Sequence, residues 1–462
     1  MEQSKKKITP LMLAMITLAI IVTLRGLPFL AKYGLSSIFF YLFSALFFLL
    51  PVSLIAAELA TAWPEKGGVF LWVSKAFGDK WGFMATFLQW IPIVIWYPTA
   101  LSFIAAAISY LFNPTLAENK FYALAMTLVI YWGATLLNFK GLKTSGWISS
   151  FCVLFGTLLP AAIIIFCAAI FLINGHPSEI SLSIKNIIPD LSNMQNIVFL
   201  AGIFLVFAGM EISAVHVNDV ENPQKGYPKA IFLSFFIILT VCILGTLSIA
   251  IVVPKDEISL VAGVLQAFKT FFTIFNIPFF TLLMALLISL GAIGQVLALI
   301  IGPTKAMLAS AQRGDLPPFF KKVNEKNIPT NILLTQGVIV TLISVVFLFM
   351  PTVSSSFWML SVLTIQLYLI MYMLFYAAAV RLRYKYPKQK RIFRVPGKNY
   401  GMWIASTVGL VAAVFVFFLS FVPPLDLPKT SIPFFIGFLI FGIILFTLIP
   451  LIIYSLKSRW QK

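Results

Sequence analysis

Long apolar stretches separated by short polar connections make up almost the whole chain. A helix that spans a lipid bilayer needs about 20 mainly apolar residues. Stretches of that kind occupy residues 10–32, 36–60, 82–111, 121–138, 147–173, 196–217, 229–253, 278–302, 331–350, 357–380, 402–422 and 432–455. The pattern predicts an all-α integral membrane protein with twelve transmembrane helices. It leaves no room for a separate soluble domain, so residues 1–462 are interpreted as a single membrane domain.

The composition supports lipid as the main solvent. Hydrophobic residues make up 60% of the chain and charged residues 10%, whereas soluble proteins carry about 25% charged residues. The net charge of +18 raises the question of a nucleic-acid partner. The basic residues lie in short loops between apolar stretches, a pattern typical of membrane topology and anionic lipid headgroups. We therefore predict the lipid bilayer as a partner and no nucleic acid.

The distribution of basic residues also predicts an orientation. An even number of spans places both termini on one side of the membrane. With the N-terminus inside, 26 of the 33 Lys and Arg residues fall in inner segments and 6 in outer ones. Cytoplasmic loops carry such an excess, so both termini are predicted to be cytoplasmic. Lys5-Lys6-Lys7 could open a signal peptide, but no clean small-residue cleavage site follows, which favours a retained first helix.

Three ionisable residues lie within the predicted spans, namely Arg25, Glu58 and Glu211. Charged groups at membrane depth are costly and usually functional. Arg25 is followed by Gly26 and Pro28, and Glu211 comes shortly after Gly209, so both sit beside helix-breaking sequence. The two interruptions occupy inverted, equivalent depths in the first and sixth stretches. Such paired interruptions indicate a transporter's binding site, since unwound backbone is tolerated there only against protein or a water-filled cavity.

The chemistry of these interruptions favours an α-amino acid as substrate. Free N–H groups at a half-helix N-terminus suit a carboxylate, and free carbonyl groups suit an ammonium group. Each of these residues also has a purely structural interpretation. Arg25 could extend to the outer interface, Glu211 could be a structural partner, and the glycine and proline could merely kink a packed helix. Glu58, at the inner end of its stretch, favours structural pairing.

Further residues supply weaker signals. Tyr368 and Tyr372 are spaced to share one helical face. With Trp358 and Tyr376 nearby they form an aromatic stripe, which usually serves packing but could serve a gate. His216, at the inner end of the sixth stretch, could tune a pH response. The three cysteines lie in apolar stretches and indicate small buried hydrophobes; no metal or other cofactor is predicted.

Four local motifs lie at the second, third and eighth spans, in residues 56–61, 64–73, 302–307 and 313–317. They resemble the motifs of amino acid–polyamine–organocation transporters at these spans. Motifs similar to those of bacterial glutamate/GABA antiporters occupy residues 209–214, 216–219, 222–223, 227–228 and 393–397. The resemblance runs from about residue 10 to 456 and is specific for the family rather than for one substrate.

The resemblance implies a LeuT-like five-plus-five inverted repeat, with residues 8–173 and 196–380 as the two repeats and 402–456 as two accessory helices. It also implies alternating access around the two interruptions. In the glutamate/GABA branch a glutamate of the sixth span matches Glu211, and a tyrosine pair of the tenth span matches Tyr368 and Tyr372.

Departures from that branch shape the expected substrate. Arg25 and Gly26 stand where the exchanger has a tyrosine and a glutamate, and Gln295 replaces a glutamate. The long C-terminal plug that gates the exchanger by pH has no counterpart, which puts acid gating in doubt. An added arginine and a lost acid make the cavity more positive, which suits a substrate with an extra carboxylate.

We therefore predict transport of amino acids by antiport, with an acidic amino acid such as glutamate exchanged for a related amine or amino acid. A proton-coupled permease of the same fold is the alternative. The fifth apolar stretch, residues 147–173, contains no lysine that could replace a coupling ion, and this absence mildly favours exchange. A membrane enzyme would need a nucleophile–base or metal-ligand set, and no such motif occurs. The expected location is a bacterial inner membrane. The predicted substrate-binding residues are Thr23, Arg25, Gly26, Phe207, Gly209, Glu211, Gln295, Tyr368 and Tyr372.

Overall fold

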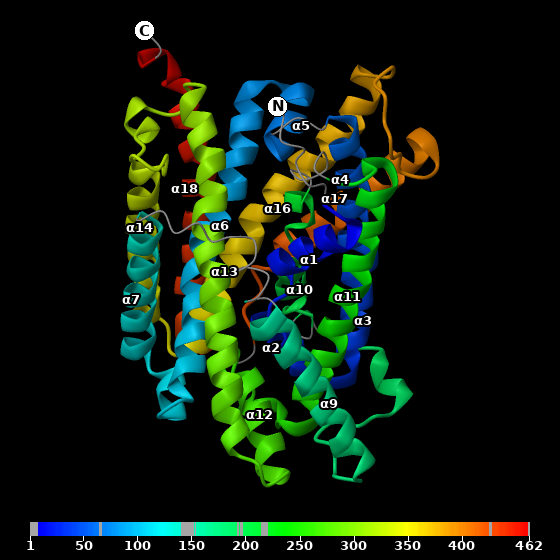
Figure 1. The fold of residues 1–462 in the computed structure, drawn as a ribbon, viewed down its shortest axis with the longest axis vertical. Coiled ribbons are helices and arrows are strands. Elements are labelled where there is room, and N and C mark those ends of the chain that lie inside the picture. Colours follow the sequence, from blue (N-terminus) through cyan, green and yellow to red (C-terminus); the bar gives the residue numbers. More distant parts are fainter. Residues whose placement is uncertain are drawn as a thin grey trace, which may run out of the picture.

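A computed structural model describes residues 8–63, 67–139, 152, 154–191, 194, 197–213, 220–424 and 427–460. Regular structure in these ranges is helical, apart from one isolated bridge between Ile8 and Val220. The longest helices run roughly along the long axis of the molecule (Figure 1). The all-α fold expected from the hydropathy pattern is therefore confirmed for the described part of the chain.

Ten helical segments in the described ranges are long and apolar enough to cross a membrane. Each coincides with one of the predicted apolar stretches. Their helices are α3 (Ser37–Ser44) continued by α4 (Leu50–Ala62), α6 (Asp79–Ser109), α7 (Lys120–Phe139), α9 (Leu159–Ile173), α11 (Pro223–Val252), α13 (Phe279–Gln312), α14 (Thr330–Ser344) continued by α15 (Val346–Phe349), α16 (Val353–Lys385), α17 (Lys398–Leu419) and α18 (Ile432–Ser455).

The two remaining predicted stretches are interrupted helices. In the first, α1 (Pro10–Ile21) ends before an extended Val22 and Thr23, and the short helices η1 (Leu24–Gly26) and α2 (Pro28–Ala31) follow. In the sixth, α10 (Leu200–Phe207) ends at an extended Ala208. Proline fits the first turn of a helix, where its missing N–H is not needed, so Pro28 restarts the helix after the first interruption.

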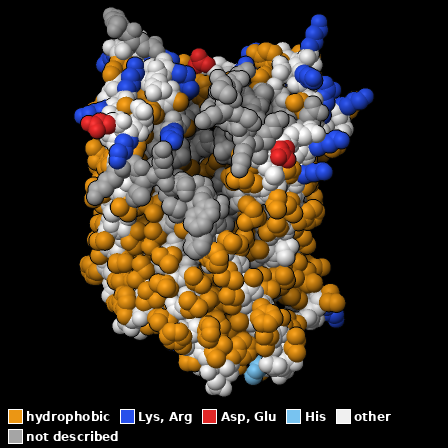
Figure 2. All heavy atoms as spheres, viewed as in Figure 1, with side chains coloured by type: hydrophobic (Ala, Val, Ile, Leu, Met, Phe, Trp, Pro, Cys, Tyr) orange, Lys and Arg blue, Asp and Glu red, His pale blue; other side chains and the backbone are white. Residues whose placement is uncertain are grey.

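Two helices, α6 and α16, form the centre of the bundle. Of the 18 most apolar consecutive residues of α6, 89% are buried inside the protein. The corresponding share is 78% for α16 and 22% for the segment that contains α18. Figure 2 shows hydrophobic side chains covering the middle and lower part of the visible surface, while Lys and Arg gather at the upper end. The outer helices thus present apolar faces to lipid. Because α6 and α16 are surrounded by protein, their polar side chains can line a site in the interior.

Side-chain contacts join several helix ends at the basic end of the molecule. Lys457, after α18, lies 2.7 Å from the carboxylate of Asp315, and the indole of Trp460 donates to the carbonyl of Gly314 at 3.1 Å. Arg313 lies 3.6 Å from the ring centroid of Phe70 in α5 (Gly68–Phe77). The ends of α13 and α18 and the helix α5 therefore meet at one end, the upper one in Figure 1.

Candidate functional site

The first interruption brings η1 and α2 against α10. Thr23 accepts a hydrogen bond from the backbone N–H of Arg25 at 3.3 Å, which fixes the start of η1. Gly26 lies so close to α10 that an added Cβ would stand 2.2 Å from Cγ2 of Val206. The absence of a side chain at this position therefore allows the two interrupted helices to touch.

The second interruption is held by a tyrosine of α16. Gly209 has φ +109°, a left-handed conformation that favours glycine. Its backbone N–H donates to the hydroxyl of Tyr372 at 2.9 Å, and that hydroxyl donates to Oε2 of Glu211 at 2.6 Å. Tyr372 thus satisfies a backbone group freed by the interruption and connects it to a buried carboxyl group.

A small cavity lies between the two interruptions. Its volume is about 60 Å³, below the roughly 300–1,000 Å³ of typical ligand pockets, so the surrounding side chains have closed around it. Four of the predicted residues are among those that line it, and the full set is Ile21, Thr23, Arg25, Ile93, Trp96, Leu205, Val206, Ala208, Ile212, Gln295, Leu299 and Tyr368.

Arg25 is a buried cation without an ionic partner in the described part of the chain. Its side chain is 2% exposed, so it does not extend to the outer interface. Nη1 donates to Oγ1 of Thr99 at 2.6 Å, and the guanidinium carbon lies 5.1 Å from the ring centroid of Trp96 and 5.5 Å from that of Phe357. Nε has no hydrogen-bond partner. Because burying an unpaired charge costs several kcal/mol, this arrangement is suited to an anion that arrives from outside.

Glu211 is also buried, but its side-chain hydrogen-bond partners among the described residues are neutral. It is 1% exposed, and besides Tyr372 it accepts from the amide of Gln89 at 3.3 Å. Among the ion pairs of the described residues, none includes Glu211 or Arg25. The site therefore holds one buried acid and one buried base that do not neutralise each other directly.

The structure separates the predicted residues into three groups. Thr23, Arg25, Gln295 and Tyr368 line the cavity. Beside the cavity, Tyr372 is hydrogen-bonded to both Gly209 and Glu211. Gly26 packs against Val206 in the cavity wall. Phe207 is fully buried against Tyr41, with ring centroids 6.0 Å apart, and does not line the cavity.

Sequence reasoning missed the contribution of α6. Gln89, Trp96 and Thr99 of this helix contact Glu211 or Arg25, yet none of them was among the predicted site residues. The sequence does indicate that α6 is unusual, because the helix contains Pro92 and Pro98 and carries polar side chains in the middle of an apolar stretch. His216 and its neighbours 214–219, which sequence analysis also singled out, lie outside the described residues.

Four buried aromatic side chains pack in sequence next to Arg25, outside the set of residues that line the cavity. Phe357 faces Arg25 and packs against Phe29 at 5.6 Å between ring centroids. Phe29 contacts Trp358 at 5.4 Å, and Trp358 contacts Phe199 at 4.5 Å. We name Phe29, Phe199, Phe357 and Trp358 the aromatic plug; each is at most 6% exposed.

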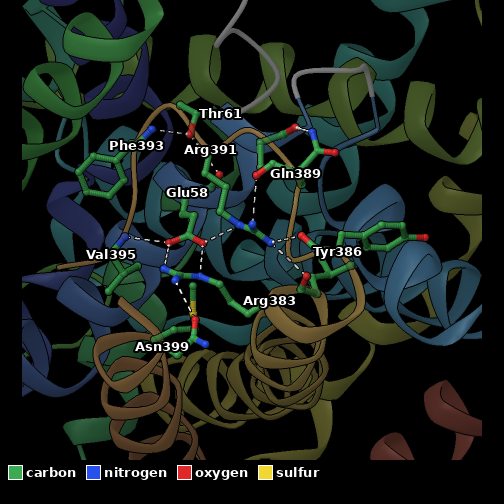
Figure 3. Close-up of polar contacts among 12 residues, drawn as sticks. Glu58, Thr61, Arg383, Tyr386, Gln389, Arg391, Phe393, Val395 and Asn399 are labelled. Carbon is green, nitrogen blue, oxygen red and sulfur yellow. Dashed lines mark hydrogen bonds and ion pairs between the residues drawn. The ribbon is translucent and has the colours of Figure 1, made fainter. Parts of the chain in front are cut away.

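Glu58 lies away from this cavity, in an ion cluster at the basic end (Figure 3). Arg383, near the end of α16, holds both carboxylate oxygens of Glu58 at 2.5 Å. Arg391 lies 3.1 Å from Oε1, and the backbone N–H of Val395 donates to Oε2 at 2.8 Å. Glu58 is fully buried, so the structural pairing favoured for this residue is confirmed. Burial lowers the pKa of the Arg391 guanidinium, and the charge of Glu58 opposes that shift.

These features define the class of protein. A bundle of membrane-crossing helices, with two interrupted helices facing each other around a small cavity that holds a buried arginine, is the architecture of a multi-pass membrane transporter. The chain belongs to the amino acid permease family, whose signature it matches over residues 8–446. The resemblance deduced from its sequence motifs is thereby confirmed.

Three relatives illustrate the similarity. An uncharacterised transporter of Legionella pneumophila is 43% identical over 450 residues, which cover 97% of each chain. A glutamate/γ-aminobutyrate antiporter of Lactococcus lactis is 33% identical over 462 residues, covering 99% of this chain and 92% of the relative. A probable agmatine/putrescine antiporter of the same species is 24% identical over 451 residues, covering 96% and 95%. All three are transporters, of a family found in bacteria.

Proposed function

We propose that this protein exchanges amino acids across a bacterial inner membrane by alternating access, using the cavity between the two interrupted helices. The buried, ionically unpaired guanidinium of Arg25 is the observation that carries the proposal. A carboxylate that enters the cavity can pair with it and offset the cost of its burial. Thr23, Gln295 and Tyr368 line the same cavity and supply polar contacts around the bound molecule.

An acidic amino acid such as glutamate suits this site best. A second carboxylate distinguishes it from neutral amino acids, and Arg25 is the one arginine or lysine that lines the cavity among the described residues. Bidentate pairing with a carboxylate is a geometry that arginine provides and lysine does not. The relative from Lactococcus lactis that is named for glutamate and γ-aminobutyrate supports this class of substrate. A related amine or amino acid is the proposed exchange partner.

A proton-coupled permease on the same fold is the second candidate. One observation favours it: Glu211 is a buried carboxyl group whose hydrogen bonds come from the neutral side chains of Tyr372 and Gln89. Such a group can hold a proton in one state of the cycle and release it in another. Exchange remains the first proposal because two of the relatives described above are named as antiporters.

The proposed topology combines the ten long segments with the two interrupted helices to give twelve crossings. Both termini are then cytoplasmic, and the end of the molecule where Lys and Arg gather (Figure 2) faces the cytoplasm. Residues 8–173 and 196–380 form the proposed inverted repeats, which place the two interruptions on opposite sides of one site, and 402–456 supply the accessory helices. Transport rather than catalysis is the proposed activity throughout.

Uptake into proteoliposomes tests this proposal. A panel of labelled amino acids is offered to vesicles that are either empty or preloaded with the unlabelled compound. We expect uptake of an acidic amino acid into preloaded vesicles and little into empty ones. Uptake into empty vesicles that follows an imposed pH gradient would replace antiport by proton-coupled transport. Uptake of no amino acid under either condition would overturn the proposal.

A further inference from the structure

A second, larger cavity lies at the end of the molecule opposite the Glu58 cluster. Its volume is about 420 Å³, within the range of typical ligand pockets. The end of α2, the end of α11 and the segments 179–190 and 198–199 form its walls. We name it the outer pocket, because it faces the outside in the orientation proposed above.

The outer pocket carries charges of both signs. Lys32 and Lys255 line it together with Glu179 and Asp190. The side chains of Lys255 and Glu179 are exposed, and no hydrogen bond or ion pair joins either of them to another described residue. The backbone of Glu179 is fixed, because its N–H donates to the carbonyl of Ile251 at the end of α11 at 2.9 Å. An exposed acid and an exposed base therefore line the same pocket and are available to a ligand that carries both an ammonium group and a carboxylate.

The aromatic plug extends from the wall of the outer pocket to Arg25 of the central cavity. Phe199 lines the outer pocket, and its ring packs edge-on against Trp358 at 4.5 Å. On the other side of the plug, Phe357 covers the guanidinium of Arg25. Ring contacts through Trp358 and Phe29 therefore connect the wall of the outer pocket to the aromatic ring that lies against Arg25.

We propose that the outer pocket is an entry site that binds the zwitterionic amino acid before the aromatic plug opens. Lys255 attracts its carboxylate and Glu179 its ammonium group. The inference rests on the proposed function, since the ligand is the transported amino acid. The outer pocket differs in its chemistry from the central cavity. The central cavity contains the buried cation of Arg25, whereas the outer pocket presents a lysine and a glutamate that are both in contact with water.

The test exploits the position of the pocket on one face. Lys255→Gln and Glu179→Gln are compared with the parent protein and with Lys269→Gln, a matched control at an exposed lysine of α12 (Gly263–Ile274) at the same end. Labelled glutamate uptake is measured in right-side-out and in inside-out vesicles. For each pocket variant we expect KM at the outer face to rise about two- to fivefold, because water screens exposed charges. KM at the inner face and the maximal rate stay unchanged, as does the control.

Two results would overturn the inference. Unchanged outer KM in both pocket variants would show that the charges do not contact the substrate, and an equal rise at both faces would indicate a general structural effect. Neither result touches the proposed function, which fails instead if the parent protein transports no amino acid. The two failures are therefore distinguishable in the same experiment.

Discussion

The hydroxyl oxygen of Tyr372 forms hydrogen bonds with two buried polar groups. It accepts from the N–H of Gly209 and donates to Glu211, and all three residues are buried in the centre of the bundle. A buried polar group that loses its partner costs about 1–3 kcal/mol. At the residue scale the site therefore depends on hydrogen bonds that water cannot replace.

Tyr372→Phe removes this hydroxyl and leaves the ring in place. We expect transport to slow by about tenfold or more, since 1.4 kcal/mol corresponds to a factor of ten and two groups lose their partner. Initial rates of uptake in proteoliposomes measure the effect. Tyr400→Phe, at a tyrosine that is 84% exposed, is the control and should match the parent. Equal rates in both variants would mean that the Tyr372 hydroxyl has no part in transport.

At the scale of elements, the contact between the two interrupted helices decides the geometry of the site. Gly26 meets Val206 of α10 with no room for a methyl group. Overfilling a packed contact costs about 1–3 kcal/mol. Here the strain would fall on the two segments that line the cavity, so function should suffer together with stability.

Gly26→Ala is expected to lower the transport rate at least tenfold, because the new methyl group forces the interrupted helices apart. The double variant Gly26→Ala/Val206→Ala removes the clashing methyl group and should recover part of the rate. Gly133→Ala in α7, where an added Cβ meets nothing within 4 Å, serves as control. A double variant as slow as Gly26→Ala would show that the close approach is not the cause.

The interruptions themselves could be predicted from sequence, whereas their partner helix could not. Gly26, Pro28 and Gly209 alter the backbone locally, and local chemistry is visible in a single sequence. The contact of Arg25 with Thr99 joins residues 74 positions apart. Hydropathy does not encode which of several apolar helices packs beside another, so the role of α6 required the structure.

At the scale of the whole molecule, the Glu58 cluster joins three separate parts of the chain. It links α4 to the end of α16 and to the segment that leads into α17. Sequence indicated a structural pairing for Glu58 because of its place at the inner end of a span. The identity of its partners, 325 and 337 positions away for Arg383 and Val395, could not be deduced.

Glu58→Gln removes the charge that neutralises Arg383 in a fully buried setting. Removing one partner of a buried ion pair typically destabilises a protein by about 3–5 kcal/mol. We therefore expect a clearly lower thermal midpoint for the purified protein in detergent, followed by tryptophan fluorescence. Glu325→Gln, in an exposed loop, should leave the midpoint unchanged. A parent-like midpoint for Glu58→Gln would mean that the cluster does not stabilise the fold.

The proposed transport depends on a contact between Arg25 and a carboxylate of the amino acid. Competition of unlabelled glutamate and glutamine with labelled substrate, in the parent protein and in Arg25→Gln, measures this contact. Truncating one partner of a buried, hydrogen-bonded charge pair costs about 2–5 kcal/mol. We therefore predict that the parent prefers glutamate and that Arg25→Gln loses this preference by a factor of about thirty or more. An unchanged ratio of the two inhibition constants in a folded Arg25→Gln variant would contradict the account.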